Sequence, residues 1–199
     1  AYAISKSKKI EKNFFFPGKA GTELNSQKII IDKNKFEEIY NFFKKEKINF
    51  VVVGPEQPLV DGIVDYLQKF NIKVFGPNKM SSQLEGSKIF TKNLCKKYNI
   101  PTADFGTFKT KEDTIKFLKK ANHPIVIKAD NLASGKGVYI CKNLDESTNA
   151  VEEIFGGKFG YAENILVEEF LEGEEMSYFI ISDGKDFRSF GTAQDHKRV

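Results

Sequence analysis

Cysteine is scarce in this sequence. Only Cys95 and Cys141 occur among its 199 residues, and neither belongs to a CxxC pair. Two cysteines cannot build a disulfide framework, and they supply too few ligands for a zinc site. We therefore expect two buried free thiols in a cytoplasmic protein.

Long hydrophobic runs are also absent. The apolar segments, such as residues 50–53, extend over only a few residues. A helix needs about 20 apolar residues to cross a bilayer, so the sequence predicts no transmembrane segment, and no signal peptide is visible. The first residue is not methionine and the last follows a strand-like segment. We interpret both ends as cuts from a longer protein.

No block of like charge occurs either. The 31 lysines and arginines and the 27 acidic residues give a formal net charge of +4. These charges are dispersed, so the composition does not favour a nucleic-acid partner. The mild positive excess fits a solvated lysine-rich surface or small anionic substrates. We expect small-molecule substrates, with no membrane and no obligate protein partner.

The first 80 residues alternate between strand and helix patterns. After the tail of a helix at 2–10, apolar runs predict strands at 14–16, 29–31, 50–53 and 73–75. Apolar residues at helical spacing fill two of the intervals: Phe36, Ile39, Tyr40 and Phe43 after a cap at Asp32, and Leu59, Ile63, Val64 and Leu67. This alternation predicts βαβ units and a parallel, doubly wound sheet, buried on both faces at 50–53. Ligands bind such sheets beyond the carboxyl ends of the strands, here at loops 17–22, 54–59 and 76–78.

The pattern changes near residues 79–86, where we place a domain boundary. Beyond it we expect an α+β arrangement with antiparallel pairing. Helices are predicted at 87–98, 112–121 and 144–155, and strands at 105–108, 125–127, 138–141, 165–167, 176–181 and 187–192. The last two strands flank Asp183-Gly184, a hairpin-type turn.

A glycine-rich loop carries the strongest chemical signal. The segment 128–138 reads KADNLASGKGV, with a lysine at a strand end and Gly-Lys-Gly before the next strand. Glycines let backbone N–H groups approach phosphate oxygens, and lysine supplies a positive charge. The segment is not a P-loop, because no GxxxxGK[ST] precedes a helix. A tight hairpin with a lysine at its tip is the simpler alternative.

An acidic hinge follows at 167–175, with the sequence VEEFLEGEE. An extended linker of this kind can present backbone groups to an adenine edge. The Glu168 carboxylate can accept from the adenine amino group, and that of Glu175 from ribose hydroxyls. An ordinary acidic surface hinge is the alternative.

Three features follow one another along the chain: Lys88, then Lys128 with its glycine loop, then the acidic hinge. This order resembles the ATP-grasp superfamily, whose two α+β subdomains hold ATP between them. The resemblance implies an N-terminal α/β domain at 1–82 that binds substrate. An incomplete ATP-grasp domain at 83–199 would follow, with a small lid subdomain at about 101–169. It also implies that ATP is contacted by Lys88, Lys128, Ser134, Gly135, Lys136, Gly137, Val138, Glu168, Glu169, Phe170, Leu171 and Glu175.

Further motifs resemble the phosphoribosylamine–glycine ligase family. They are VGPEQPL at 53–59, FGP at 75–77, LEGSK at 84–88, the 128–138 loop and QDHKR at 194–198, and PGKAGT at 17–22 is similar to the family's PGNAGT loop. Lys19, Asn131 and Ser134 depart from that pattern. The resemblance implies catalytic roles for Lys128, Asp195 and Lys197. It implies substrate binding by Gly18, Gly21, Thr22, Gly54, Pro55, Glu56, Asp195, His196, Lys197 and Arg198.

The activity implied by this resemblance is ligation of glycine to 5-phosphoribosylamine through glycyl phosphate, with ATP converted to ADP and phosphate. The product, glycinamide ribonucleotide, belongs to de novo purine biosynthesis. The resemblance implies Mg²⁺, or Mn²⁺ in its place, with metal ligands outside this chain. No covalent nucleophile is needed, in agreement with the lack of a Ser/Cys–His arrangement, and we interpret His123 as structural.

Two alternatives stay open. One is another ATP-grasp carboxylate–amine ligase or a biotin carboxylase-like enzyme, against which the motifs at 54–59 and 194–198 argue. The other is a non-catalytic nucleotide- or nucleic-acid-binding module, supported by little beyond a pI near 8.8.

Overall fold

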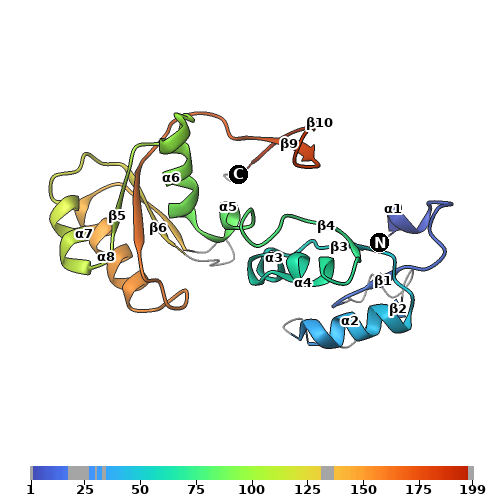
Figure 1. Ribbon diagram of the computed structural model, residues 1–199. Coiled ribbons are helices and arrows are strands. Elements are labelled where there is room, and N and C mark those ends of the chain that lie inside the picture. Colours follow the sequence, from blue (N-terminus) through green and yellow to red (C-terminus); the bar gives the residue numbers. More distant parts are fainter. Residues whose placement is uncertain (1, 18–26, 30, 33–34, 131–136, 197–199) are drawn as a thin grey trace. The chain divides into compact units, whose positions relative to one another are not determined.

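The computed structural model describes residues 2–17, 27–29, 31–32, 35–130 and 137–196. They belong to two compact units, which are drawn in Figure 1. Unit 1 comprises Ala1–Ile100 and Asp130–Gly135, and unit 2 comprises Pro101–Ala129 and Lys136–Val199. Each unit has its own hydrophobic core.

Unit 1 contains two pairs of parallel strands. Strand β1 (Phe14–Phe15) pairs with β2 (Gln27–Lys28), and β3 (Phe50–Val52) pairs with β4 (Lys73–Phe75). Parallel strands separated by helices confirm the predicted α/β class. The second strand lies at 27–28 and not at the predicted 29–31. Ile29 follows the strand and is buried, so its hydrophobicity reflects burial and not strand pairing.

The core of unit 1 is built by helices α2 (Phe36–Lys45) and α4 (Ile63–Gln68). Its buried side chains are those of Ile39, Ile63, Val64 and Leu67. The helical stripe predicted at residues 36–43 is therefore confirmed, and Ile63, Val64 and Leu67 of the second stripe are buried on α4. The predicted cap at Asp32 is wrong, because the residue at the N-cap of α2 is Lys35, whose own side chain makes no capping hydrogen bond.

Segment 50–68 differs from its prediction in two further respects. Strand β3 is not buried on both faces, since Phe50 and Val52 are exposed and β4 is its only partner strand in the described part of the chain. The stripe at 59–67 belongs to two helices, α3 (Glu56–Asp61) and α4. Gly62 separates them with a φ of +96°, which glycine adopts without a steric penalty.

Short helices α1 (Tyr2–Ser5) and α5 (Gln83–Gly86) and the longer α6 (Lys88–Tyr98) complete unit 1. The N-cap residue of α6 is Ser87, whose Oγ accepts from the Phe90 N–H at 3.1 Å. Asn99 ends the helix in the left-handed conformation, with a φ of 53°. The helix predicted at 87–98 is confirmed.

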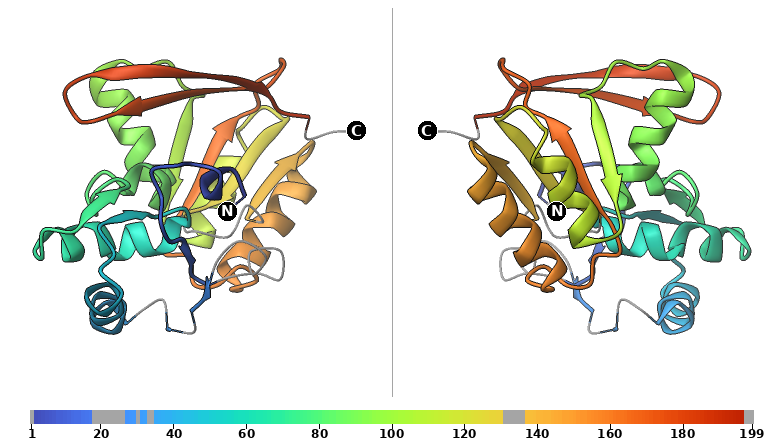
Figure 2. Two further views of the ribbon diagram at one scale, coloured as in Figure 1. Left: turned by 90° about the vertical axis from the view of Figure 1, so that its right-hand side faces the viewer. Right: turned by 90° about the vertical axis from the view of Figure 1, so that its left-hand side faces the viewer.

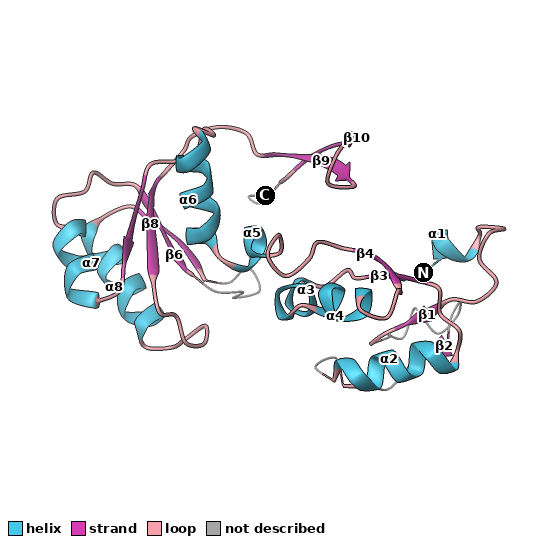
Figure 3. Ribbon diagram, in the orientation of Figure 1, coloured by secondary structure: helices cyan, strands magenta, loops and turns pink. Residues whose placement is uncertain are grey.

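Unit 2 is built on a four-stranded antiparallel sheet with the order β5-β8-β6-β7. The strands are β5 (Phe105–Phe108), β6 (Ile125–Ala129), β7 (Val138–Cys141) and β8 (Ile165–Glu169). Helices α7 (Lys111–Leu118) and α8 (Leu144–Phe155) cover one face of this sheet, as the views in Figure 2 and the colouring in Figure 3 show. The predicted α+β arrangement with antiparallel pairing is confirmed.

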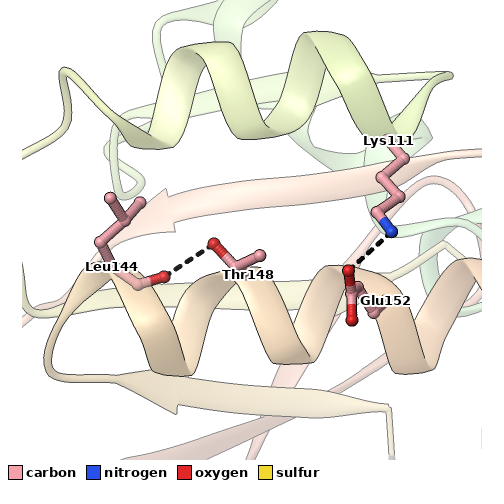
Figure 4. Close-up of polar contacts among 4 residues, drawn as sticks. All are labelled: Lys111, Leu144, Thr148 and Glu152. Carbon is pink, nitrogen blue, oxygen red and sulfur yellow. Dashed lines mark hydrogen bonds and ion pairs between the residues drawn. The ribbon is translucent and has the colours of Figure 1, made fainter.

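Helices α7 and α8 lie side by side on the sheet. An ion pair joins them, with 2.6 Å between Lys111 Nζ and Glu152 Oε1 (Figure 4). Both partners are partly exposed, so this pair contributes less than about 1 kcal/mol. The helices are held mainly by buried apolar side chains such as Leu118, Val151 and Ile154.

A two-stranded hairpin ends the described chain. Strand β9 (Met176–Ser182) pairs antiparallel with β10 (Phe187–Gln194), and the turn contains Asp183 and Gly184, as predicted. Backbone N–H groups of Asp186 and Lys185 donate to the Asp183 carboxylate and lower its pKa. Gly184 adopts a φ of +90°, which the turn requires of a residue without Cβ.

Candidate functional site

The sheet of unit 2 has one face packed on helices and one face that carries polar groups. Along β6, Ile125, Ile127 and Ala129 are fully buried in the core. The alternate residues of the same strand, Val126 and Lys128, point to the opposite face because side chains alternate along a strand. The Lys128 side chain therefore lies on the face away from the core, one residue before the strand ends.

Glu168 reaches the same face from β8. The register places Val126 opposite Glu168, so Lys128, two residues along β6, is its diagonal neighbour. Lys128 Nζ donates to Glu168 Oε2 at 2.6 Å. The side chains are 26% and 6% exposed, respectively. The structure therefore brings together a cation and a carboxylate that the sequence had assigned separately to phosphate and adenine.

Two exposed apolar side chains stand beside this ion pair on β7. Val138 lies opposite Lys128, and Ile140 lies opposite Val126, so both share the face of the ion pair. They are 43% and 44% exposed. Val138 was predicted as a nucleotide contact, whereas Ile140 was missed, although the two-residue period of a strand places it on the same face. Exposed aliphatic groups next to a charge pair can hold the flat, apolar face of a purine base.

The loop between β6 and β7 is closed at its base by a backbone hydrogen bond of 2.9 Å from Ala129 N to Gly137 O. Gly137 is buried. The predicted phosphate-loop residues Ser134, Gly135 and Lys136 lie outside the described residues.

The hinge after β8 is anchored by Glu169. Its Oε1 accepts from the Asp104 N–H at 3.0 Å, and its own N–H donates to the Asp104 carbonyl at 3.0 Å. The Glu169 carboxylate and its backbone N–H are thus both engaged by the protein. Leu171, farther along the hinge, is exposed.

Glu175 and Asp195 meet at the open end of the hairpin. The Asp195 N–H donates to the Glu175 carbonyl at 3.0 Å, next to the Met176–Gln194 pair that closes the strands. The residue predicted to hold ribose and the first residue of the DHKR motif are therefore neighbours. His196 is exposed, and Lys197 and Arg198 lie outside the described residues.

In unit 1 the motifs pack around helix α3. A Cβ added to Gly76 would lie 2.9 Å from Leu59 Cδ2, and one added to Gly86 would lie 2.9 Å from Val60 Cγ2. Glycine at these two positions therefore allows the FGP and LEGSK motifs to approach α3 closely. Gly54, Pro55 and Glu56 are exposed where α3 begins.

Lys88 is the first residue of α6 and is half-buried. Of the predicted substrate residues, Gly18, Gly21 and Thr22 lie outside the described residues. Within the described ranges, no three or more His, Cys, Asp and Glu side chains gather into a group that could hold a metal ion. No helix there is both long and apolar enough to cross a membrane.

One Ser–His contact exists that the sequence did not predict. The ring Nε2 of His123 lies 2.6 Å from Ser147 Oγ. Ser147 donates its own hydroxyl hydrogen to the Asn143 carbonyl at 2.7 Å, so the ring N–H must donate to the hydroxyl oxygen. Because Ser147 is fully buried and its proton is engaged, this pair ties the start of β6 to α8 and is no activated nucleophile.

The two cysteines form no disulfide, as predicted. Cys141 is buried, and burial, reinforced by the Glu146 carboxylate, raises its pKa to about 11. Such a thiol is inert at neutral pH, since the thiolate is the nucleophile. Cys95 was also predicted to be buried, but it is only half-buried.

Two family models together match the whole sequence. Residues 86–199 match the ATP-grasp (A) domain of phosphoribosylglycinamide synthetase, and residues 1–85 match the N domain of the same enzyme.

Individual relatives agree with these matches. The phosphoribosylamine–glycine ligase of Mesorhizobium japonicum is 46% identical over 200 residues, which covers 100% of this chain and 47% of the relative. The crystal structure of phosphoribosylamine–glycine ligase from Thermotoga maritima superposes with a TM-score of 0.78 at 30% identity, covering 99% of this chain and 47% of that chain. The chain thus spans about half the length of the curated relatives it matches.

A more distant structure shares the fold. The biotin carboxylase of Campylobacter jejuni, in a complex with β-γ-ATP, superposes with a TM-score of 0.67 at 18% identity over 80% of this chain and 37% of that chain. At this identity the likeness concerns the fold alone.

Proposed function

The chain belongs to the phosphoribosylglycinamide synthetase family, and we propose on this basis that it forms part of an enzyme that ligates glycine to 5-phosphoribosylamine. The reaction consumes ATP and yields glycinamide ribonucleotide, ADP and phosphate, a step of de novo purine biosynthesis. The glycine carboxylate attacks the γ-phosphate to give glycyl phosphate, and the amine of phosphoribosylamine then displaces phosphate.

The observation that carries the nucleotide site is the Lys128–Glu168 ion pair beside exposed Val138 and Ile140. A phosphate oxygen can replace the carboxylate as the partner of the Lys128 ammonium, because both are anionic acceptors. Glu168 then accepts from the adenine amino group, and Val138 and Ile140 contact the base. The same face thus offers partners for both ends of ATP.

The remaining nucleotide contacts are assigned by the family resemblance. Lys88 and the loop residues Ser134, Gly135, Lys136 and Gly137 bind phosphates. Glu169 belongs to the ATP site at the start of the hinge, the backbone of Phe170 and Leu171 reads the adenine edge, and Glu175 holds the ribose hydroxyls.

The acceptor substrate is assigned to the N-terminal loops and the DHKR motif. Gly18, Gly21, Thr22, Gly54, Pro55 and Glu56 line the phosphoribosyl site, together with Asp195, His196, Lys197 and Arg198. Lys197 and Arg198 supply positive charge to its phosphate, and Asp195 and Lys197 complete the catalytic group with Lys128. Residues 1–82 form the substrate-binding domain, and residues 83–199 the ATP-grasp part with its lid at about 101–169.

Catalysis in this scheme is positioning and charge stabilisation. Lys128 holds phosphate charge, and neither Cys141 nor Ser147 takes part, because both are buried. The family resemblance also implies Mg²⁺, which would neutralise phosphate charge when bound. Among the described residues, no three or more His, Cys, Asp and Glu side chains gather into a group that could hold it.

ADP release by the full-length protein tests the substrate assignment. Phosphoribosylamine is generated in situ because it is short-lived. We expect ADP only when glycine and phosphoribosylamine are both present, and much less with alanine, because glycine has almost no side chain and must be selected by exclusion of larger amino acids. ADP formed equally well with bicarbonate in place of glycine would support a biotin carboxylase-like enzyme instead. ATP-independent, salt-sensitive RNA binding without ADP release would support a nucleic-acid-binding module.

A further inference from the structure

Helix α6 is capped by a carboxylate from a distant part of the sequence. The Asp130 Oδ1 atom accepts from the Ile89 N–H at 3.1 Å, and both Asp130 carboxylate oxygens lie 3.1 Å from Ser87 Oγ. Ser87 Oγ in turn accepts from the Phe90 N–H at 3.1 Å. All of these residues belong to unit 1.

The network satisfies the donors that a helix leaves unpaired at its start. The N–H groups of the first turn have no partner within a helix. Ser87 takes the third of them and Asp130 the second, so that two side chains share the capping task. The negative charge of Asp130 also lies at the positive end of the helix dipole, where it is stabilising.

Lys88 is the residue that this arrangement holds. It is the first residue of α6 and stands between the cap residue Ser87 and the capped residue Ile89. If the first turn frays, the backbone of Lys88 loses its fixed direction. Asp130, for its part, follows Lys128 by two residues in the sequence.

We propose that Asp130 is a positioning residue for ATP: it caps the first turn of α6 and thereby fixes Lys88 for its phosphate contact. This role rests on the proposed function, because it uses the assignment of Lys88 to ATP. Asp130 itself touches no substrate in this scheme. Its effect on ATP must therefore pass through Lys88.

Steady-state kinetics of the full-length enzyme test this role. Removal of a charge-assisted phosphate contact weakens affinity about ten- to a hundredfold, so Lys88→Ala raises the KM for ATP by that factor. Asp130→Ala loosens the first turn of α6, so that Lys88 no longer holds the phosphate, and raises the KM for ATP about fivefold or more. The kcat and the KM for glycine stay within about twofold of wild type. Asp130→Asn keeps an acceptor for Ile89 N–H and recovers most of the loss.

Thr110→Ala is the matched control. Thr110 caps α7 in the same manner, with its Oγ1 accepting from the Asp113 N–H at 3.2 Å. Its loss costs a helix cap of the same kind without touching Lys88, so the KM for ATP stays within about twofold. A Thr110→Ala variant that raises this KM as much as Asp130→Ala would reduce the effect to general stability and overturn the role.

The decisive comparison is made in a Lys88→Ala background. If Asp130 acts through Lys88, adding Asp130→Ala there raises the KM for ATP no further. An equal additional increase in that background, or no change in the single variant, overturns the role while leaving the proposed function intact. A wild-type enzyme that releases no ADP with glycine and phosphoribosylamine refutes the proposed function and this role together.

Hydrogen exchange of backbone amides tests the capping of α6 by Asp130 without an activity assay. Asp130→Ala should speed exchange of the Ile89 and Phe90 amides by about fivefold or more, while amides of α7 keep their protection. Unchanged exchange at Ile89 would show that Asp130 does not hold the first turn of α6.

Discussion

Replacing Lys128 by alanine separates the structural role of its ion pair with Glu168 from the role toward ATP that we propose for it. In the variant the Glu168 carboxylate, 6% exposed, loses the ammonium at 2.6 Å. Breaking a fully buried ion pair costs about 3–5 kcal/mol. Lys128 is 26% exposed, so water can approach the remaining carboxylate. We therefore expect a loss of about 2–3 kcal/mol in the local stability of β6 and β8.

A second substitution distinguishes this cost from the loss of the ligand contact. In Lys128→Ala/Glu168→Gln no buried charge remains, so stability should recover to within about 1 kcal/mol of wild type. ATP affinity should not recover, because the phosphate contact is still missing. Because Glu168→Gln also perturbs the adenine contact, we expect affinity to be at least as weak as in Lys128→Ala, about ten- to a hundredfold or more below wild type.

Native-state hydrogen exchange of the β6 and β8 amides measures the first effect, and calorimetric titration of ATP into the full-length protein measures the second. Lys111→Ala is the matched control. The ion pair of Lys111 with Glu152 has the same 2.6 Å distance, but the two side chains are 42% and 51% exposed, respectively. It should change stability by less than about 1 kcal/mol and leave ATP affinity unaltered. Unchanged exchange in Lys128→Ala would refute the buried pair, and unchanged ATP affinity would refute the nucleotide assignment.

Three further outcomes are expected. Glu168→Gln should weaken ATP binding and leave tripolyphosphate binding nearly unaltered, whereas an equal loss for both ligands would indicate a general electrostatic or folding effect. Gly86→Ala should lower the free energy of unfolding by about 1–3 kcal/mol, because its added Cβ meets the stiff Val60 side chain. Gly54→Ala is the control and should leave this free energy unchanged, since among the described residues no atom beyond its chain neighbours lies within 4 Å of its added Cβ. Equal urea midpoints for the two variants would contradict this. At pH 8 a thiol-disulfide reagent should label Cys95 in the native protein and Cys141, with its pKa of about 11, only after unfolding; two equally fast thiols would contradict the burial of Cys141.

Local patterns in the sequence predicted most of the elements. Helix α8 and strands β5 and β7 begin and end where the patterns placed them, because apolar spacing and turn residues are local signals. Two predictions failed because the same local pattern fits more than one structure. Ile29 is buried outside a strand, and the helical stripe at 59–67 is divided by Gly62, whose left-handed backbone the stripe does not reveal.

The site required knowledge of strand register. Lys128 and Glu168 were each predicted as ligand residues, but their pairing depends on β6 lying antiparallel to β8, 40 positions farther along the chain. Ile140 joins the site only once β7 is aligned with β6. The contact of Asp130 with Ser87 and Ile89 spans more than 40 residues, and neither periodicity nor motif spacing reports such contacts.

Methyl NMR of the full-length protein, titrated with a non-hydrolysable ATP analogue, tests most directly that the sheet face carrying Lys128 and Glu168 binds the nucleotide. Val138 and Ile140 should shift strongly, since they stand beside Lys128. Ile127 and Ile154, buried on the helix-covered face, should shift little. Shifts confined to the helix-covered face, or no shift of Val138 and Ile140 at saturation, would contradict the nucleotide site.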